Sequence, residues 1–182
     1  GGRGANATNG TFQWVNIDPA AVSDHVKIKV ASNQSADVAV YNESPYFNIS
    51  PYLTASEPAT AKALAINKTG DDLQVNWTIY GTITKVHVWY YNGTGWDHAT
   101  PNGGVNAVNL GGGKGNFTWK NDNITAKNFL TENTTIRVAN YTSSDSPPAG
   151  SPYSDAPANL SLRGKIFVTT PTTGQILRVN QT

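Results

Sequence analysis

Short segments in which apolar and polar residues alternate recur along this 182-residue chain, and this period of two limits the folds that it can adopt. In the segment 75–80, for example, Val75, Trp77 and Ile79 fall on one side of a strand, and Asn76 and Thr78 on the other. Such alternation is typical of half-buried β-strands. It predicts strands at residues 26–30, 37–41, 75–80, 85–91, 116–120, 135–141, 165–170 and 175–179, with a hairpin turn at Asn92-Gly93. The sequence therefore predicts an all-β chain folded as an antiparallel β-sandwich.

Helix signals are few. Ser56, Glu57 and Pro58 form a typical helix start and predict a short helix over residues 59–66. Asp18 followed by Pro19 predicts one helical turn at residues 20–22, and residues 123–130 fit another short helix. We expect a leader and donor strand at residues 1–17, followed by a β-sandwich body at residues 18–182.

The composition argues against several classes of protein. The net charge is only +1 and no run of Lys and Arg is present, which argues against a nucleic-acid binder, because such proteins need a basic surface to bind phosphates. No apolar stretch approaches the roughly 20 residues that cross a bilayer as a helix. The chain has no Cys, which excludes disulfides and thiolate chemistry. It has no Met and opens at Gly1, which we interpret as a processed amino terminus that has lost a signal peptide.

The context of asparagine is the strongest pointer to function. Of the 20 Asn, 14 stand in Asn-x-Ser/Thr with x not Pro, whereas the Ser and Thr content alone would give roughly 3.6 such triplets. This excess predicts a secreted glycoprotein that presents N-linked glycans on most of its surface. The predicted sites are Asn6, Asn9, Asn33, Asn42, Asn48, Asn67, Asn76, Asn92, Asn116, Asn123, Asn133, Asn140, Asn159 and Asn180. Avoidance of both Cys and Met is a thermophile tendency, so we expect an archaeal cell-surface location.

The amino-terminal region has an unusual pattern. Residues 1–10 are rich in Gly, Ala and Asn and are expected to be mobile in an isolated chain. The segment that follows carries apolar side chains on both faces, with Phe12 and Trp14 on one and Val15 and Ile17 on the other. It fits either a central strand of its own sandwich or a donor strand that fills a groove in a neighbouring copy. The candidate donor residues are Thr11, Phe12, Gln13, Trp14, Val15, Asn16 and Ile17.

No catalytic motif is present, and we expect that the chain is not an enzyme. There is no His-Glu-x-x-His, Gly-x-Ser-x-Gly or phosphate-loop spacing, and His87 falls on the outward side of its strand. Loop carboxylates among amide oxygens are ligands that calcium prefers, which predicts at least one calcium site. The candidate ligands are Asp18, Asp71, Asp72 and Asp122. Three aromatic residues around one hairpin, Trp89, Tyr91 and Trp96, suggest a platform for sugar rings as an alternative function.

The run TFQWVNIDPAAVSDHVKIKVASNQSADVAVYNESPYFNISPYLT, residues 11–54, resembles the cannula proteins of hyperthermophilic archaea. These secreted glycoproteins build hollow tubes on the cell surface. The resemblance implies a jelly-roll-like β-sandwich, a donor strand inserted into the next subunit, and calcium at the subunit interfaces. The donor role maps onto residues 11–17, whereas no calcium ligand is carried over.

We therefore expect a structural subunit of an extracellular, glycosylated tube or filament, a head-to-tail homopolymer joined by donor-strand complementation. A secreted carbohydrate-binding module and a non-polymerising surface coat are the alternatives.

Overall fold

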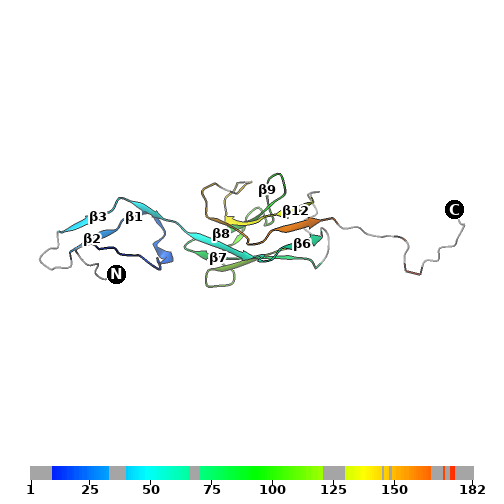
Figure 1. Cartoon of the computed structure of the whole chain (residues 1–182), viewed down its shortest axis with the longest axis horizontal. Coiled ribbons are helices and arrows are strands. Elements are labelled where there is room, and N and C mark those ends of the chain that lie inside the picture. The colour runs from blue at the N-terminus through cyan, green and yellow to red at the C-terminus, as the bar shows by residue number, and fades with distance from the viewer. Residues whose placement is uncertain are drawn as a thin grey trace.

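The computed structural model describes residues 10–32, 40–65, 70–120, 130–144, 146–147, 149–164, 170 and 173–174. Within these ranges the chain is nearly all β, with several antiparallel sheets and one 3-10 turn, which confirms the all-β part of the predicted fold class. The strands form two parts along the long axis, an arm at one end and a larger body (Figure 1). We define the arm as the described residues from 10 to 49 and the body as those from 52 onward.

The arm is a two-stranded antiparallel ribbon preceded by an irregular segment. Strand β1 pairs with β4 and strand β2 with β3, and the register shifts between Ser23 and Val26. The single predicted helical turn is present as a 3-10 turn, where Asp18 Oδ1 accepts a hydrogen bond of 2.9 Å from the backbone N–H of Ala20. The elements are η1 Pro19–Ala21, β1 Ser23–Val26, β2 Lys29–Ala31, β3 Tyr41–Glu43 and β4 Phe47–Ile49.

The body consists of three sheets. One has the order β11-β7-β5, another β12-β15-β6, and the largest β10-β8-β13-β14 with β9 also paired to β8. All their pairings are antiparallel except β15 with β6, where Leu160 pairs with Lys62 and Arg163 with Ala65. The strands are β5 Tyr52–Glu57, β6 Lys62–Ala65, β7 Leu73–Tyr80, β8 Lys85–Tyr91, β9 Trp96–His98, β10 Val105–Asn106, β11 Lys114–Trp119, β12 Thr131–Thr134, β13 Ile136–Asn140, β14 Tyr153–Asp155 and β15 Leu160–Arg163.

One hydrophobic core holds the body together. It takes side chains from all three sheets, among them Leu53, Trp77, Val88, Val138 and Leu162. Strand β7 alternates as its sequence predicts, with every second side chain buried. The hairpin after β8 is also confirmed, because β9 returns along β8 with Trp96 opposite Tyr91.

The helix predicted over residues 59–66 is wrong. Residues 62–65 form strand β6, with Leu64 only 1% exposed in the core. Ser56 and Glu57, which carry the predicted start signal, are the last two residues of strand β5, although Glu57 Oε2 accepts a hydrogen bond of 2.7 Å from the backbone N–H of Ala59. Pairing with β15 and burial of Leu64 outweigh that signal, as tertiary contacts often do. The helix predicted at 123–130 and the strands at 165–170 and 175–179 lie almost entirely outside the described residues.

The arm meets the body at Gly81, in the turn between β7 and β8. Gly81 has a φ of +93°, and a Cβ added there would lie 2.7 Å from Val22 Cγ2 and 3.1 Å from Pro51 Cβ. Val22 immediately precedes β1 and Pro51 immediately precedes β5, so both ends of the ribbon lie against this glycine. The absence of a side chain at position 81 is what allows the arm to seat on the body.

Replacing Gly81 by Ala is expected to lower the free energy of unfolding more than the same change at Gly93. Both glycines have a positive φ, near +90°, but nothing lies within 4 Å of a Cβ at Gly93. Gly93→Ala therefore measures the cost of the left-handed backbone alone, about 1–2 kcal/mol. Gly81→Ala adds the overlap with Val22, for a further 1–3 kcal/mol or so. Urea unfolding of the two variants measures the difference, and equal losses would contradict the close contact.

Candidate functional site

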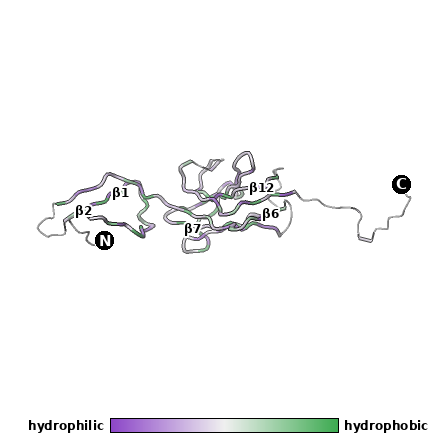
Figure 2. The backbone as a smooth tube through the Cα atoms, viewed as in Figure 1, coloured by the Kyte–Doolittle hydropathy of each residue, from purple (hydrophilic) through white to green (hydrophobic). Residues whose placement is uncertain are grey.

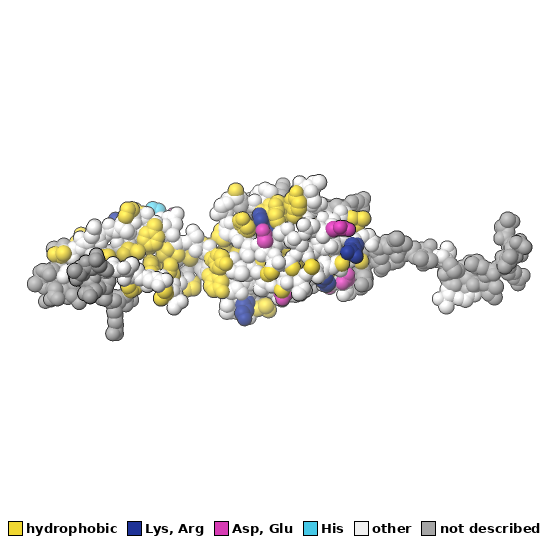
Figure 3. Space-filling view, viewed as in Figure 1, with side chains coloured by type: hydrophobic (Ala, Val, Ile, Leu, Met, Phe, Trp, Pro, Cys, Tyr) yellow, Lys and Arg dark blue, Asp and Glu magenta, His cyan; other side chains and the backbone are white. Residues whose placement is uncertain are grey.

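The arm exposes a large amount of apolar surface. None of its described residues is buried, whereas the body contains the entire core. A two-stranded ribbon without a core is marginally stable in water, so the arm needs cover from elsewhere. Figure 2 shows apolar residues along the arm, and Figure 3 shows them gathered on its surface. Its exposed large apolar residues are Phe12, Trp14, Val15, Ile17, Ile28, Val30, Val40, Tyr41 and Tyr46.

One face of the ribbon is polar and internally paired. Lys27 Nζ lies 3.2 Å from Glu43 Oε2 and 4.5 Å from the ring centre of Tyr46. Lys29 Nζ lies 3.7 Å from the ring centre of Tyr41. These ion-pair and cation–π contacts satisfy the charges of this face and hold its aromatic rings in place.

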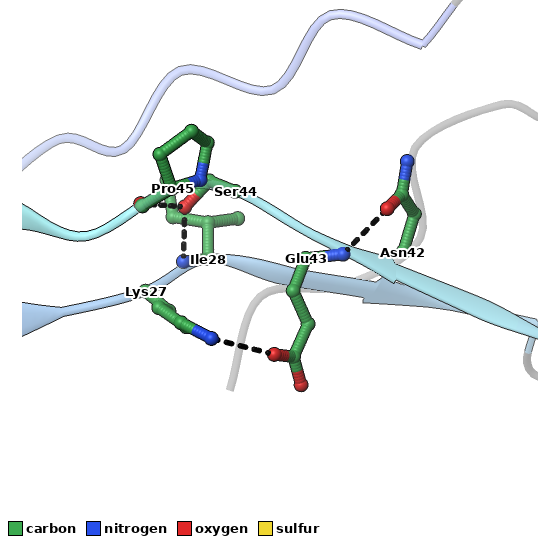
Figure 4. Close-up of polar contacts among 6 residues, drawn as sticks. All are labelled: Lys27, Ile28, Asn42, Glu43, Ser44 and Pro45. Carbon is green, nitrogen blue, oxygen red and sulfur yellow. Dashed lines mark hydrogen bonds and ion pairs between the residues drawn. The ribbon is translucent and has the colours of Figure 1, made fainter.

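On the opposite face of the ribbon, Ile28 lies across from Ser44 and Val30 across from Asn42, so apolar and uncharged polar side chains share this face. Figure 4 shows Ile28 on the side of the ribbon away from Lys27, with the Ile28 N–H donating to Ser44 Oγ at 3.0 Å. Val30 follows by strand alternation and is 69% exposed. Exposed apolar side chains such as Ile28 and Val30 contribute no hydrophobic stabilisation to a monomer. Contiguous exposed apolar surface often marks a site of interaction.

Residues 11–17 are not a strand of the chain's own sheets. They form no described ladder, and each of them is exposed. Phe12 is 58% exposed and Val15 60%, so both faces of the two-faced segment are accessible to solvent. The interpretation as a central strand of the chain's own body therefore fails. The donor interpretation stays a prediction, and the projecting part of the molecule extends beyond this segment to the end of β4.

The predicted calcium ligands lie apart or are already paired. Asp18 caps η1 in the arm, while Asp71 precedes β7 in the body, where its carboxylate lies 3.7 Å from Lys62 Nζ and accepts from the Ala65 N–H at 3.3 Å. Asp72 follows Asp71, and its backbone carbonyl accepts from Lys62 Nζ. Asp122 lies outside the described residues. Within the described ranges no three His, Asp or Glu side chains gather into one group.

The three aromatic residues proposed as a sugar platform differ in their burial and in the side chains that they contact. Trp89 is fully buried, so it cannot take part in an open platform. Trp96 is half-buried, and the guanidinium of Arg137 lies 4.3 Å from its ring centre and 4.0 Å from that of Tyr153. Arg137 is also held by two hydrogen bonds to Asp155, of 2.6 and 3.0 Å, which raise its pKa. The three hairpin aromatics do not form one open platform.

His87 is buried rather than on the surface, because later segments cover the outer face of β8. Its Nδ1 lies 2.7 Å from Thr100 Oγ1, its ring centre lies 5.1 Å from that of His98, and Tyr141 packs against it at 4.8 Å. His98 in turn donates from Nδ1 to the carbonyl of Thr100 at 2.8 Å. Burial lowers the pKa of His87, and the neighbouring His98 lowers it further.

Stability is expected to fall as the pH drops below about 6.5, the ordinary pKa of histidine. In the unfolded chain His87 takes up a proton near that pH, whereas the folded chain binds it only at a lower pH. The unfolded state then binds more protons, so acid favours unfolding and a return to pH 7.5 restores stability. Urea unfolding at pH 7.5 and 5 measures the loss, which His87→Gln should reduce relative to the unmodified chain. The same pH dependence in His87→Gln and in the unmodified chain would contradict this role of His87.

The predicted glycosylation sites fall on accessible positions wherever the structure describes them. Eight of the fourteen lie in the described ranges, and none of the eight is buried. Asn76 stands on the outer face of β7 directly opposite Asn116 of β11, so one sheet face would carry two neighbouring glycans. The exposed members are Asn42, Asn48, Asn133 and Asn159, and the half-buried ones are Asn76, Asn92, Asn116 and Asn140. The other six, Asn6, Asn9, Asn33, Asn67, Asn123 and Asn180, lie outside the described residues.

The candidate functional site is therefore the arm, an apolar surface that projects from a well-packed body. Sequence reasoning identified residues 11–17 but missed the ribbon, whose alternation resembles that of a core strand. Among the described residues no helix is long and apolar enough to cross a membrane. The chain matches no protein-family model, and a search of curated proteins finds no significant relative.

Proposed function

We propose that this chain is the structural subunit of an extracellular, glycosylated filament or tube, and that it polymerises head to tail through its arm. The observation that carries the proposal is the arm itself, in which no described residue is buried and nine large apolar side chains are exposed. Association of identical chains would remove this surface from water without requiring a different protein.

The energetics favour such a joint. Burying one large apolar side chain contributes roughly 1.5–3 kcal/mol, so Phe12, Trp14, Val15 and Ile17 together would stabilise a contact by several kcal/mol. If the segment pairs as a strand, backbone hydrogen bonds would add register and direction. A contact between an arm and a different surface of the next copy is heterologous, and it generates filaments when the rotation does not close.

The remaining parts of the proposal concern the fold of the body, its glycans, its cellular location and calcium. The body would be a jelly-roll-like β-sandwich, and the accessible sequons would carry N-linked glycans at the archaeal cell surface. Calcium would bind between subunits. The accessible sequons and the exposed arm support this setting, as does the resemblance of residues 11–54 to cannula proteins.

Negative-stain electron microscopy of the purified chain tests the proposal. We expect tubes or filaments in millimolar calcium and dispersed particles when a chelator replaces it. Filaments under both conditions would remove calcium from the proposal but retain the assembly. Monodisperse particles under both conditions, with the amino terminus intact, would contradict the polymer and favour a carbohydrate-binding or coat function.

A further inference from the structure

The hairpin between β8 and β9 carries a predicted glycosylation site at its tip, Asn92-Gly93-Thr94. Asn92 Oδ1 accepts three hydrogen bonds, from the Thr94 N–H at 3.0 Å, from Thr94 Oγ1 at 2.9 Å and from the Gly95 N–H at 2.9 Å. Backbone N–H groups can only donate, so the amide atom that the loop holds is the oxygen. The loop therefore fixes the orientation of the Asn92 amide through its oxygen and leaves the nitrogen, Nδ2, on the other side.

Nδ2 is the atom to which an N-linked glycan is attached. At Asn159 this atom already donates a hydrogen bond of 2.6 Å to Asn133 Oδ1, whereas Asn92 Nδ2 makes no hydrogen bond to any described residue. Nothing lies within 4 Å of a Cβ at Gly93 or Gly95, so the space around the tip of the hairpin is open. The folded hairpin can therefore carry a glycan on Asn92 without losing a contact.

A row of aromatic side chains begins beside this asparagine. Tyr91 precedes Asn92 and lies opposite Trp96, with 5.6 Å between the two ring centres. The guanidinium of Arg137 stands between the rings of Trp96 and Tyr153, at 4.3 and 4.0 Å from their centres. We call Tyr91, Trp96, Arg137 and Tyr153 the aromatic strip.

The aromatic strip is held in place and is partly open to solvent. Two hydrogen bonds from Arg137 to Asp155 fix the guanidinium, which in turn positions the ring of Trp96. Tyr91 and Trp96 are half-buried, and Tyr153 is 49% exposed. The face of an aromatic ring carries partial negative charge, so it attracts the weakly positive C–H groups that cover one side of a sugar ring. A fixed and accessible strip of this kind suits a sugar.

We propose that the aromatic strip binds the first sugars of the chain's own glycan on Asn92, an inference that rests on the glycosylation in the proposed function. The ligand is a pyranose ring that packs on Tyr91 and Trp96. Consecutive Cα atoms are about 3.8 Å apart and those of an opposed strand pair about 5 Å, so the glycan starts within reach of both rings. Because the sugar is tethered, its effective concentration is high and a weak contact suffices. The glycan then covers the hairpin and stabilises the body.

A double-mutant cycle between the glycan and Trp96 tests this contact in the chain made by a eukaryotic secretory host, whose N-linked glycans begin with chitobiose. Asn92→Asp removes the glycan but keeps an oxygen that can accept the three loop hydrogen bonds. Trp96→Leu keeps an apolar side chain but removes the aromatic face, and Tyr91→Leu takes its place if that variant does not fold. We expect Asn92→Asp to raise the equilibrium constant for unfolding about two- to tenfold, the usual strength of one aromatic contact, and to lose this effect when Trp96→Leu is present.

Two controls isolate the glycan. The same variants made in a host that does not glycosylate give the effect of the new charge alone, which is subtracted. Asn133→Asp removes a glycosylation site on β12 that has no aromatic residue within two positions, so its effect should be the same with and without Trp96→Leu.

The outcomes separate this inference from the assembly. A coupling to Trp96 no larger at Asn92 than at Asn133 would overturn the inference, as would peptide mass spectrometry that finds Asn92 unmodified. Free chitobiose that stabilises the unglycosylated chain through Trp96, without coupling in the glycosylated chain, would assign the strip to the sugar of another molecule and also overturn it. Filaments seen by electron microscopy would keep the proposed polymer in each of these cases. Dispersed particles together with coupling at Asn92 would remove the polymer and keep the glycan contact.

Discussion

A chain that begins at Asp18 should fold but fail to assemble, whereas a chain that begins at Thr11 should assemble like the full chain. The difference between the two is the segment whose apolar side chains lie on both faces, and all of its residues are exposed in the single chain. The four large apolar side chains are about half exposed in the single chain, so losing their contacts costs roughly 3–6 kcal/mol at each joint. We therefore expect the critical concentration for assembly to rise at least about 100-fold.

Sedimentation of polymer across a concentration series measures this loss, and urea unfolding of the monomer shows whether the body remains intact. Two point variants test the contribution of a single side chain of this segment. Trp14→Ser should weaken assembly, whereas Tyr153→Ser, which removes an exposed aromatic side chain on β14, should not. Loss of the fold in the chain that begins at Asp18 would show that the segment stabilises its own body. Unchanged assembly would remove it from the joint.

Trp77→Ala is expected to lower the free energy of unfolding by about 3–5 kcal/mol, the usual cost of deleting a buried aromatic side chain. Trp77 is 1% exposed at the centre of the core, and its Nε1 donates a hydrogen bond of 2.7 Å to the carbonyl of Ala107. The substitution leaves a large cavity and also removes the partner of a buried carbonyl. For a body of this size, a loss on that scale takes away a large share of the total stability.

Two companion variants separate these causes. Trp77→Phe keeps most of the apolar volume and removes the hydrogen bond to Ala107, for an expected loss of about 1–3 kcal/mol. Gly115→Ala places a methyl group against the indole of Trp77 and the carbonyl of Ala107, so it should also destabilise the body, by about 1–3 kcal/mol. Gly103→Ala is the matched control, because nothing lies within 4 Å of a Cβ at that position. Urea unfolding of all four variants gives the comparison, and a neutral Gly115→Ala would contradict this packing.

The sequence predicted the strand class well where one face of a strand meets the core. Strand β7 is the clearest case, because its alternation and its buried face follow from the order of its residues, although it begins at Leu73, two residues before the predicted start. Strand β8 shows the limit of the same argument. Its second face is buried by His98, Thr100 and Tyr141, which come from later segments, and no local pattern reports such cover.

The arm shows the converse error: here a strand face that the sequence predicts to be half-buried is exposed. Val26, Ile28 and Val30 alternate with lysines as the residues of a half-buried strand do, yet none of the three is buried. Periodicity states which side chains share a face but not whether the chain supplies anything to cover that face.

The parallel pairing of β6 with β15 sets an order of events during synthesis. Lys62 meets Leu160, so the body cannot close until nearly all of its strands have been made, and pairings so distant in sequence form slowly. The arm, in contrast, precedes the body in the chain, so its apolar residues emerge while the body is still open. That apolar surface is exposed until β15 pairs with β6, and if the predicted sequons Asn42 and Asn48 carry glycans, these would shield it from premature contacts.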